Sequence, residues 1–150
     1  METAGVVSST HQFESTVVKA PIGKIWEDFR ALKFDTLFPS TVTKTEFTEG
    51  KAGALGSVVK ITYKDKSTWS YSVNELSDLN HHVSFELVEA EPKPTVSSIQ
   101  HSIKLFRVTD DNSTYIRWET DFSNDADANV IQDSKFKKVD YFKDLKKTYA

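Results

Sequence analysis

Histidine and tyrosine side chains in the alternating segments of this sequence are the groups best suited to proton transfer. His101 lies between Ile99 and Ile103, which places its ring among apolar side chains on one face of a strand. Burial of this kind lowers the pKa of a histidine, and the ring can then hold a ligand by hydrogen bonding or, with a tyrosine, relay a proton to a bound carbonyl. His101 and Tyr71 are therefore the candidate catalytic residues. The competing interpretation makes His101 a core residue whose hydrogen bonds are satisfied.

Two other polar groups do not predict a reactive site. His81 and His82 are adjacent in a turn, where alternation sends the rings apart, and no third ligand accompanies them, so we expect no metal site. Arg117, Glu119 and Asp121 form a charged row on one face of a strand, which is typical of a solvated outer face. A register shift of one residue would instead turn this row into the interior. The absence of cysteine excludes thiolate chemistry and disulfides.

The glycine-rich stretch EGKAGALGSVV resembles a phosphate loop only superficially. A Walker loop ends in Gly-Lys-Ser/Thr and opens a helix, whose N-terminus faces the phosphate. Here Gly56 and Ser57 open an alternating segment, and Lys51 precedes the last two glycines instead of following them. The stretch is therefore interpreted as a turn between two strands.

The period of the apolar residues divides the chain into four parts. A strand is predicted within residues 11–20, and Pro21 then begins a short amphipathic helix with three- and four-residue apolar spacing. From Ser40 to Phe122 the period is two, over six short segments separated by turn residues, which predicts an antiparallel meander. Helical character returns at about residues 125–148, with Ser123, Asn124 or Asp125 as the N-cap. The apolar stripe of this last helix consists of Ile131, Phe136, Val139, Phe142, Leu145 and Tyr149.

These elements predict an α+β fold. The apolar stripe of the C-terminal helix and the apolar face of the sheet cover each other best if a curved antiparallel sheet of seven strands wraps around the helix. Two short helices would connect the first and second strands. We expect residues 1–10 to be a flexible N-terminus and residues 11–150 to form a single domain.

This order of elements resembles that of the START-like, or SRPBCC, superfamily of helix-grip proteins, which includes polyketide cyclases, birch pollen allergens and plant abscisic-acid receptors. The residues that carry the resemblance are Val18, Ala20, Pro21, Ile25 and Trp26, the turn from Gly50 to Gly56, and the run FELVEAEP at 85–92. The resemblance implies that the glycine turn lies at the rim of a cavity. The gate and latch of the receptor branch are not matched by Lys64-Asp65-Lys66 and Glu91-Pro92-Lys93-Pro94, so the resemblance extends to the superfamily and not to the receptors.

Charge and hydropathy restrict the partners and the location. A net charge of −3 and a pI near 5.8 give no reason to expect nucleic acid as a partner. No apolar run has the length of a membrane span, and the first ten residues lack the basic and apolar regions of a secretory signal. The predicted location is the cytoplasm, and the oligomeric state stays open.

Alternation along the strands predicts which side chains line a pocket between sheet and helix. The helix was expected to add Phe136 and Val139 from its stripe, and Lys143 for an anionic ligand head. The strands contribute Val59, Ile61, Tyr63, Trp69, Tyr71, Val73, Phe85, Leu87, Ile99, His101, Ile103, Ile116 and Trp118, with Thr120 as a further polar group.

The pocket and the resemblance together favour binding or carriage of a small hydrophobic molecule, such as a lipid, isoprenoid, sterol or polyketide-like aromatic. The resemblance also implies an alternative, a cyclase, dehydratase or aromatase that folds its substrate in the cavity without a cofactor. A second alternative is a protein-interaction module, as in chaperone co-activators with this fold. Binding comes first, because the sequence shows no dense group of acid and base side chains.

Overall fold

The computed structural model describes residues 9–150; residues 1–8, most of the segment predicted to be flexible, lie outside the described residues. Ten elements follow one another along this part of the chain: β1 (His11–Val18), α1 (Ile22–Arg30), α2 (Phe34–Leu37), β2 (Val42–Glu49), β3 (Val58–Tyr63), β4 (Thr68–Ser77), β5 (His82–Glu91), β6 (Ile99–Val108), β7 (Ser113–Phe122) and α3 (Ala128–Thr148).

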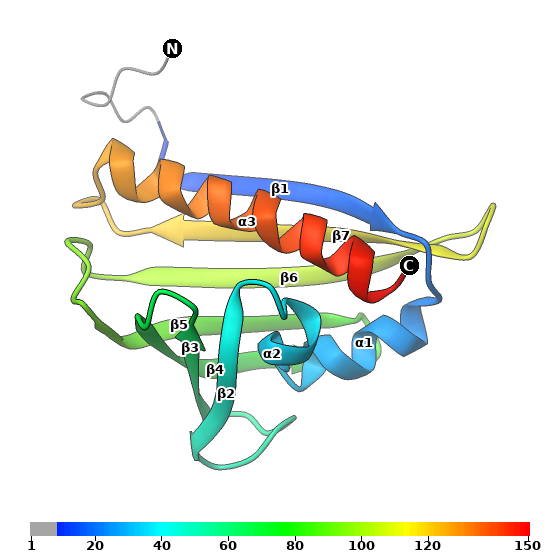
Figure 1. The fold of residues 1–150 in the computed structure, drawn as a ribbon, viewed down its shortest axis with the longest axis horizontal. Coiled ribbons are helices and arrows are strands. Elements are labelled where there is room, and N and C mark those ends of the chain that lie inside the picture. Colours follow the sequence, from blue (N-terminus) through cyan, green and yellow to red (C-terminus); the bar gives the residue numbers. More distant parts are fainter. Residues whose placement is uncertain (1–8) are drawn as a thin grey trace.

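The strands form one antiparallel sheet that curves around α3. Its seven strands lie in the order β1-β7-β6-β5-β4-β3-β2, so β1 and β2 are the two edges. Figure 1 shows β2 running across the direction of β6 and β7, and α3 lying against the sheet on its concave side. The α+β fold with two short helices between the first two strands is confirmed. No helix among residues 9–150 is both long enough and apolar enough to span a membrane.

The register of the strands places one polar row on the inner face. Gln12 on β1 is opposite Thr120 on β7, Thr120 is opposite His101 on β6, and His101 is opposite Phe85 on β5. Side chains at directly opposite positions of neighbouring strands lie next to one another on the same face. Gln12, Thr120 and His101 therefore form a continuous polar strip inside the sheet.

The charged row on β7 belongs to the outer face. His11 Nδ1 lies 2.7 Å from the Asp121 carboxylate, and the Arg117 guanidinium lies 4.4 Å from the centre of the Phe13 ring. Both contacts join β7 to outward-facing residues of β1. The alternation predicted for the last strand thus holds, and the charges of this row do not enter the interior.

Helix α1 is held to the sheet by its apolar stripe and by one carboxylate. Ile25, Trp26 and Phe29 are its buried residues. Asp78, in the turn after β4, accepts hydrogen bonds of 2.8 Å from both Trp26 Nε1 and Arg30 Nε.

The glycine turn packs on the same arginine. Gly53 has a φ of +79°, and a Cβ atom at this position would lie 2.8 Å from a guanidinium nitrogen of Arg30. The positive φ favours glycine here, and a Cβ atom would also displace the end of the Arg30 side chain. The turn is a strand connection, as predicted, but it packs on α1.

Helix α3 begins later than predicted. Its N-cap is Asp127, whose carboxylate accepts a hydrogen bond of 2.9 Å from the amide of Val130. Asp125, an expected cap, instead binds the backbone amide and hydroxyl of Ser97 and the hydroxyl of Ser123. These hydrogen bonds lower the pKa of Asp125 to about 2 and fix the connection between β7 and α3 against the segment before β6.

The C-terminal end of α3 is fastened by side-chain hydrogen bonds to the region of α1 and α2. The buried Asp144 carboxylate accepts from Ser40 N at 2.8 Å and from Ser40 Oγ at 2.7 Å. Thr148 Oγ1 donates to the carbonyl of Leu37 at 3.2 Å. The Tyr149 hydroxyl donates to Asp28 at 2.5 Å. Together these bonds fix the end of the helix that lies farther from the cavity described next.

Candidate functional site

A cavity of about 320 Å³ lies between the concave face of the sheet and the first half of α3. The sheet and α2 contribute Phe34, Tyr63, Trp69, Tyr71, Ile99, His101, Trp118 and Phe122. Helix α3 contributes Val130, Asp133, Ser134, Lys137, Lys138 and Tyr141, and the β5–β6 connection contributes Pro92, Lys93, Pro94 and Thr95. This volume is at the lower end of the range for small-molecule sites.

The inner wall is built from aromatic rings. Trp118 packs in parallel on Tyr141 with a centroid distance of 5.3 Å and edge-on against Phe34 at 5.8 Å. Tyr71 meets the His101 ring edge-on at 5.4 Å. Rings in such arrangements are rigid, because each is held in place by several neighbours. The cavity is therefore formed before any ligand arrives.

The cavity opens toward the β5–β6 connection. Trp69, Pro92 and Lys137 line both the cavity and a surface recess next to it, which also includes Asp65 and Ser67. Lys137 borders both the cavity and the recess, and its ammonium lies 4.7 Å from the Trp69 ring centre. These residues define the mouth.

His101 presents a hydrogen-bond donor to the cavity. Its Nδ1 lies 3.1 Å from Trp118 Nε1 and 2.9 Å from Thr120 Oγ1. An indole nitrogen only donates, so Nδ1 must be the acceptor, and the proton of the neutral ring is on Nε2. Burial lowers the pKa of His101 well below its ordinary value, with a further contribution from the charges of Lys138 and Lys137. The ring is thus neutral, and its N–H is at Nε2, the nitrogen that is not hydrogen-bonded to Trp118 or Thr120.

Three tyrosine hydroxyls share the same interior. Tyr141 and Tyr63 are joined by a hydrogen bond of 2.8 Å. Burial raises the pKa of Tyr63 and of Tyr71 well above the ordinary range, so these phenols stay protonated. They act as hydrogen-bonding groups and not as phenolate bases.

Lys138 is the charged residue most deeply enclosed in the wall. Only 1% of its surface is exposed, and its ammonium donates to Gln12 Oε1 at 2.6 Å and to Ser134 Oγ at 2.8 Å. Burial lowers the pKa of Lys138 to about 7, and the negative charge of Glu14 raises it by a smaller amount. Among residues 9–150 no group of three or more metal-ligating side chains is gathered.

Six of the predicted pocket residues lie in the lining: Tyr63, Trp69, Tyr71, Ile99, His101 and Trp118. The structure does not bring the other strand residues to the cavity surface. They lie on the predicted inner face but belong to the apolar core that includes residues of α1, α2 and the second half of α3. This group comprises Val59, Ile61, Val73, Phe85, Ile103 and Ile116, which are buried, and Leu87, which is partly buried.

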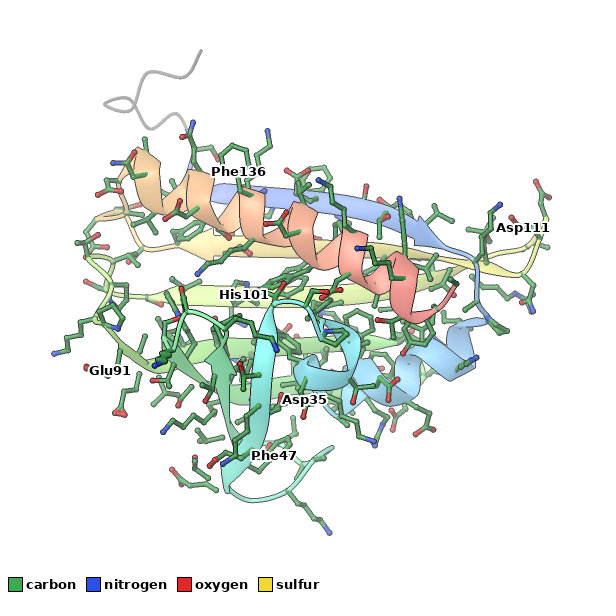
Figure 2. All side chains as sticks on the ribbon, in the orientation of Figure 1. Asp35, Phe47, Glu91, His101, Asp111 and Phe136 are labelled. Carbon is green, nitrogen blue, oxygen red and sulfur yellow. The ribbon has the colours of Figure 1, made fainter. Side chains whose placement is uncertain are left out.

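The predictions for α3 and for the glycine turn need correction. Phe136 is 61% exposed, Val139 is half-buried, and Lys143 is exposed, so none of them lines the cavity. Phe136 is two residues from both Ser134 and Lys138, about 200° around the helix, and so lies on the opposite face. His101 on β6 and Phe136 on α3 are labelled in Figure 2. The turn from Gly50 to Gly56 is absent from the lining because it packs on α1.

Twelve lining residues were not predicted. Those on α3 follow the helical spacing 130, 133–134, 137–138 and 141, but most are polar, so a search for an apolar stripe passes over them. The unpredicted residues are Phe34, Pro92, Lys93, Pro94, Thr95, Phe122, Val130, Asp133, Ser134, Lys137, Lys138 and Tyr141.

No protein-family model and no curated protein matches this chain. Solved structures do match it. A protein of Nitrosospira multiformis has a TM-score of 0.79 at 16% identity, over 93% of this chain and 96% of that chain. The major latex-like protein 151 of Panax ginseng has a TM-score of 0.75 at 18% identity, with the same coverage of 93% and 96%. Ara h 8.0201 has a TM-score of 0.72 at 20% identity, over 91% and 94%.

These likenesses extend over nearly the whole length of each chain and show the fold. The protein has the helix-grip fold, a curved seven-stranded sheet closed by a long C-terminal helix. The helix-grip fold that the resemblance to the START-like, or SRPBCC, superfamily implied is therefore confirmed.

Proposed function

We propose that this protein binds or carries a small hydrophobic molecule, such as a lipid, isoprenoid, sterol or polyketide-like aromatic, in the cavity under α3. The observation that carries the proposal is the preformed aromatic wall, with isolated hydrogen-bonding groups at His101 and Tyr71. Apolar walls supply binding energy and isolated polar groups fix orientation. Residues 11–150 would act as one domain, in the cytoplasm, with no nucleic acid as partner.

The state of His101 supports binding over catalysis. A general base needs a free lone pair, but Nδ1 faces the indole N–H of Trp118, and Nε2 carries the proton. A general acid needs an imidazolium, which burial disfavours. A cyclase, dehydratase or aromatase that works without a cofactor is the second candidate, because His101 and Tyr71 do reach the same cavity.

The aromatic wall gives a direct test with a neutral fluorescent probe such as N-phenyl-1-naphthylamine. Trp69→Ala and Tyr71→Ala should each weaken binding about tenfold, since losing roughly 60 Å² of apolar contact costs about 1.5 kcal/mol. Lys60, on the opposite face of β3 from the cavity, is the control, and Lys60→Ala should leave the dissociation constant unchanged. Absence of probe binding to the wild type, or equal losses in all three variants, would contradict the proposal.

A second variant separates carrier from enzyme. His101→Gln should keep the affinity for a bound ligand within about threefold, because the amide can donate to the ligand and accept from Trp118. If the ring moves a proton, the variant should lose turnover by about 10²–10⁴-fold and keep most of its binding. The affinity for the ligand and the turnover rate are measured on the same protein preparation. Unchanged turnover would remove His101 from any catalytic role.

A further inference from the structure

Lys138 is a buried cation whose hydrogen-bond partners are neutral. An ammonium group carries three N–H donors, and those of Lys138 reach only the amide oxygen of Gln12 and the hydroxyl of Ser134. None of the ion pairs found among residues 9–150 includes Lys138. Burying a charge without a counter-charge is costly, and proteins usually pair such a group. Here one donor has no partner, and no carboxylate among residues 9–150 forms an ion pair with this buried ammonium, which lines the cavity.

The neighbouring charges do not supply the counter-ion. Glu14 on β1 raises the pKa of Lys138 but forms no ion pair with it, and its carboxylate accepts a hydrogen bond of 2.9 Å from Gln12 Nε2. Asp133 shares the cavity wall but is exposed. Lys137 and Lys93 are also in the lining and add positive charge. The interior facing α3 is therefore positive.

Two other polar residues of the lining, His101 and Tyr71, also offer donors. The strip from Gln12 through Thr120 to His101 leads from the ammonium to the imidazole across three strands. His101 ends this strip with an N–H at Nε2, and the Tyr71 phenol remains protonated. A ligand that satisfies this wall must bring acceptors, and at Lys138 it must bring a negative charge.

We propose that the ligand is an amphiphile with a carboxylate head, which forms a charge-assisted hydrogen bond with Lys138 while its apolar body lies against the aromatic wall. This assignment rests on the proposed function and names its ligand class. A single negative charge matches a single ammonium with one free donor. The other two lysines of the lining, Lys137 and Lys93, are exposed, so the lining offers no second buried ammonium to match the second charge of a phosphate monoester.

The test compares decanoate with decan-1-ol, two probes that share a chain and differ in the head group. Their affinities are measured at pH 6 by displacement of N-phenyl-1-naphthylamine. The wild type should prefer decanoate by about 10- to 100-fold, the effect of one charged hydrogen bond. Lys138→Met should abolish the preference and keep decan-1-ol binding within about threefold. Lys135→Met, at an exposed lysine of the same helix, should behave as the wild type.

A measurement on the wild type alone guards against a variant that fails to fold. Raising the pH from 6 to 9 removes the charge of Lys138, so the preference for decanoate should fall steadily while decan-1-ol binding stays constant. Equal affinity for the two probes at pH 6, or a preference that survives in Lys138→Met, would overturn the carboxylate assignment and leave the hydrophobic cavity standing. Failure of both probes to bind would overturn the proposed function itself.

Discussion

Replacing Trp118 with alanine should lower the free energy of unfolding by about 3–5 kcal/mol, the cost of a large aromatic deletion in a packed core. Trp118 is 2% exposed and lies at the centre of the aromatic wall, parallel to Tyr141 and edge-on to Phe34. Its removal would enlarge the existing cavity and also take the indole donor from His101. Urea unfolding followed by circular dichroism measures the effect.

Phe136 provides the matched control, since it is an aromatic residue of comparable size on α3. It is 61% exposed, so Phe136→Ala should change the free energy of unfolding by no more than about 0.5 kcal/mol. A large loss in Phe136→Ala, or a small one in Trp118→Ala, would mean that the rotation of α3 against the sheet is wrong.

The second large effect is a pH-dependent cost of burying Lys138. The lysine pKa falls from 10.5 in the unfolded chain to about 7 in the fold, so between these values the unfolded state binds more protons. Stability must then rise with pH across this window, and below pH 7 the whole cost is present. The wild type should gain about 2–3 kcal/mol relative to Lys138→Met between pH 7 and pH 9, at about 1.4 kcal/mol per pH unit.

The measurement is urea unfolding of the two proteins at pH 6, 7, 8 and 9. The difference between them isolates Lys138, because every other titrating group is common to both. Lys135→Met should follow the wild type at each pH, since the side chain of Lys135 is exposed. A difference between wild type and Lys138→Met that does not change with pH would show that Lys138 keeps an ordinary pKa.

The strands were the part of the fold that the sequence predicted best. Side chains along a strand point alternately to two faces. The inner face of β7 carries Ile116, Trp118 and Phe122, whereas its outer face carries charged residues. One correct choice of face therefore places every residue of a strand. For this reason the alternation of the sequence alone places His101 and Tyr71 in the interior.

The face of α3 that points toward the sheet could not be predicted in the same way. Its apolar residues do not form one face: Phe136 lies outside, whereas Ser134 and Lys138 face the sheet. An apolar stripe is a reliable guide only where a helix covers a dry core, and the first half of α3 covers a cavity with polar groups. The inward lysine predicted at position 143 is instead found at position 138.

The β5–β6 connection at the mouth was not predicted, for another reason. Its residues Pro92 to Thr95 belong to a connection without periodicity, so no pattern assigns them a face. The glycine turn was placed at the rim only because of the superfamily resemblance, and the seat on Arg30 that displaces it depends on a contact between segments far apart in the sequence.

The two halves of α3 are held by different numbers of side-chain hydrogen bonds, and this difference affects how fast a ligand can enter or leave the cavity. Asp144, Thr148 and Tyr149 tie the last turns to distant segments by hydrogen bonds. The first half, over the mouth, is joined to the sheet by the Lys138–Gln12 hydrogen bond and by the packing of Val130 and Ile131 against a small apolar cluster. Local opening requires the breaking of only those bonds that hold the opening segment. Opening of the first half alone would leave the hydrogen bonds of the second half intact. Residence times in the cavity would then follow this partial opening, and would not be limited by the much slower unfolding of the whole protein.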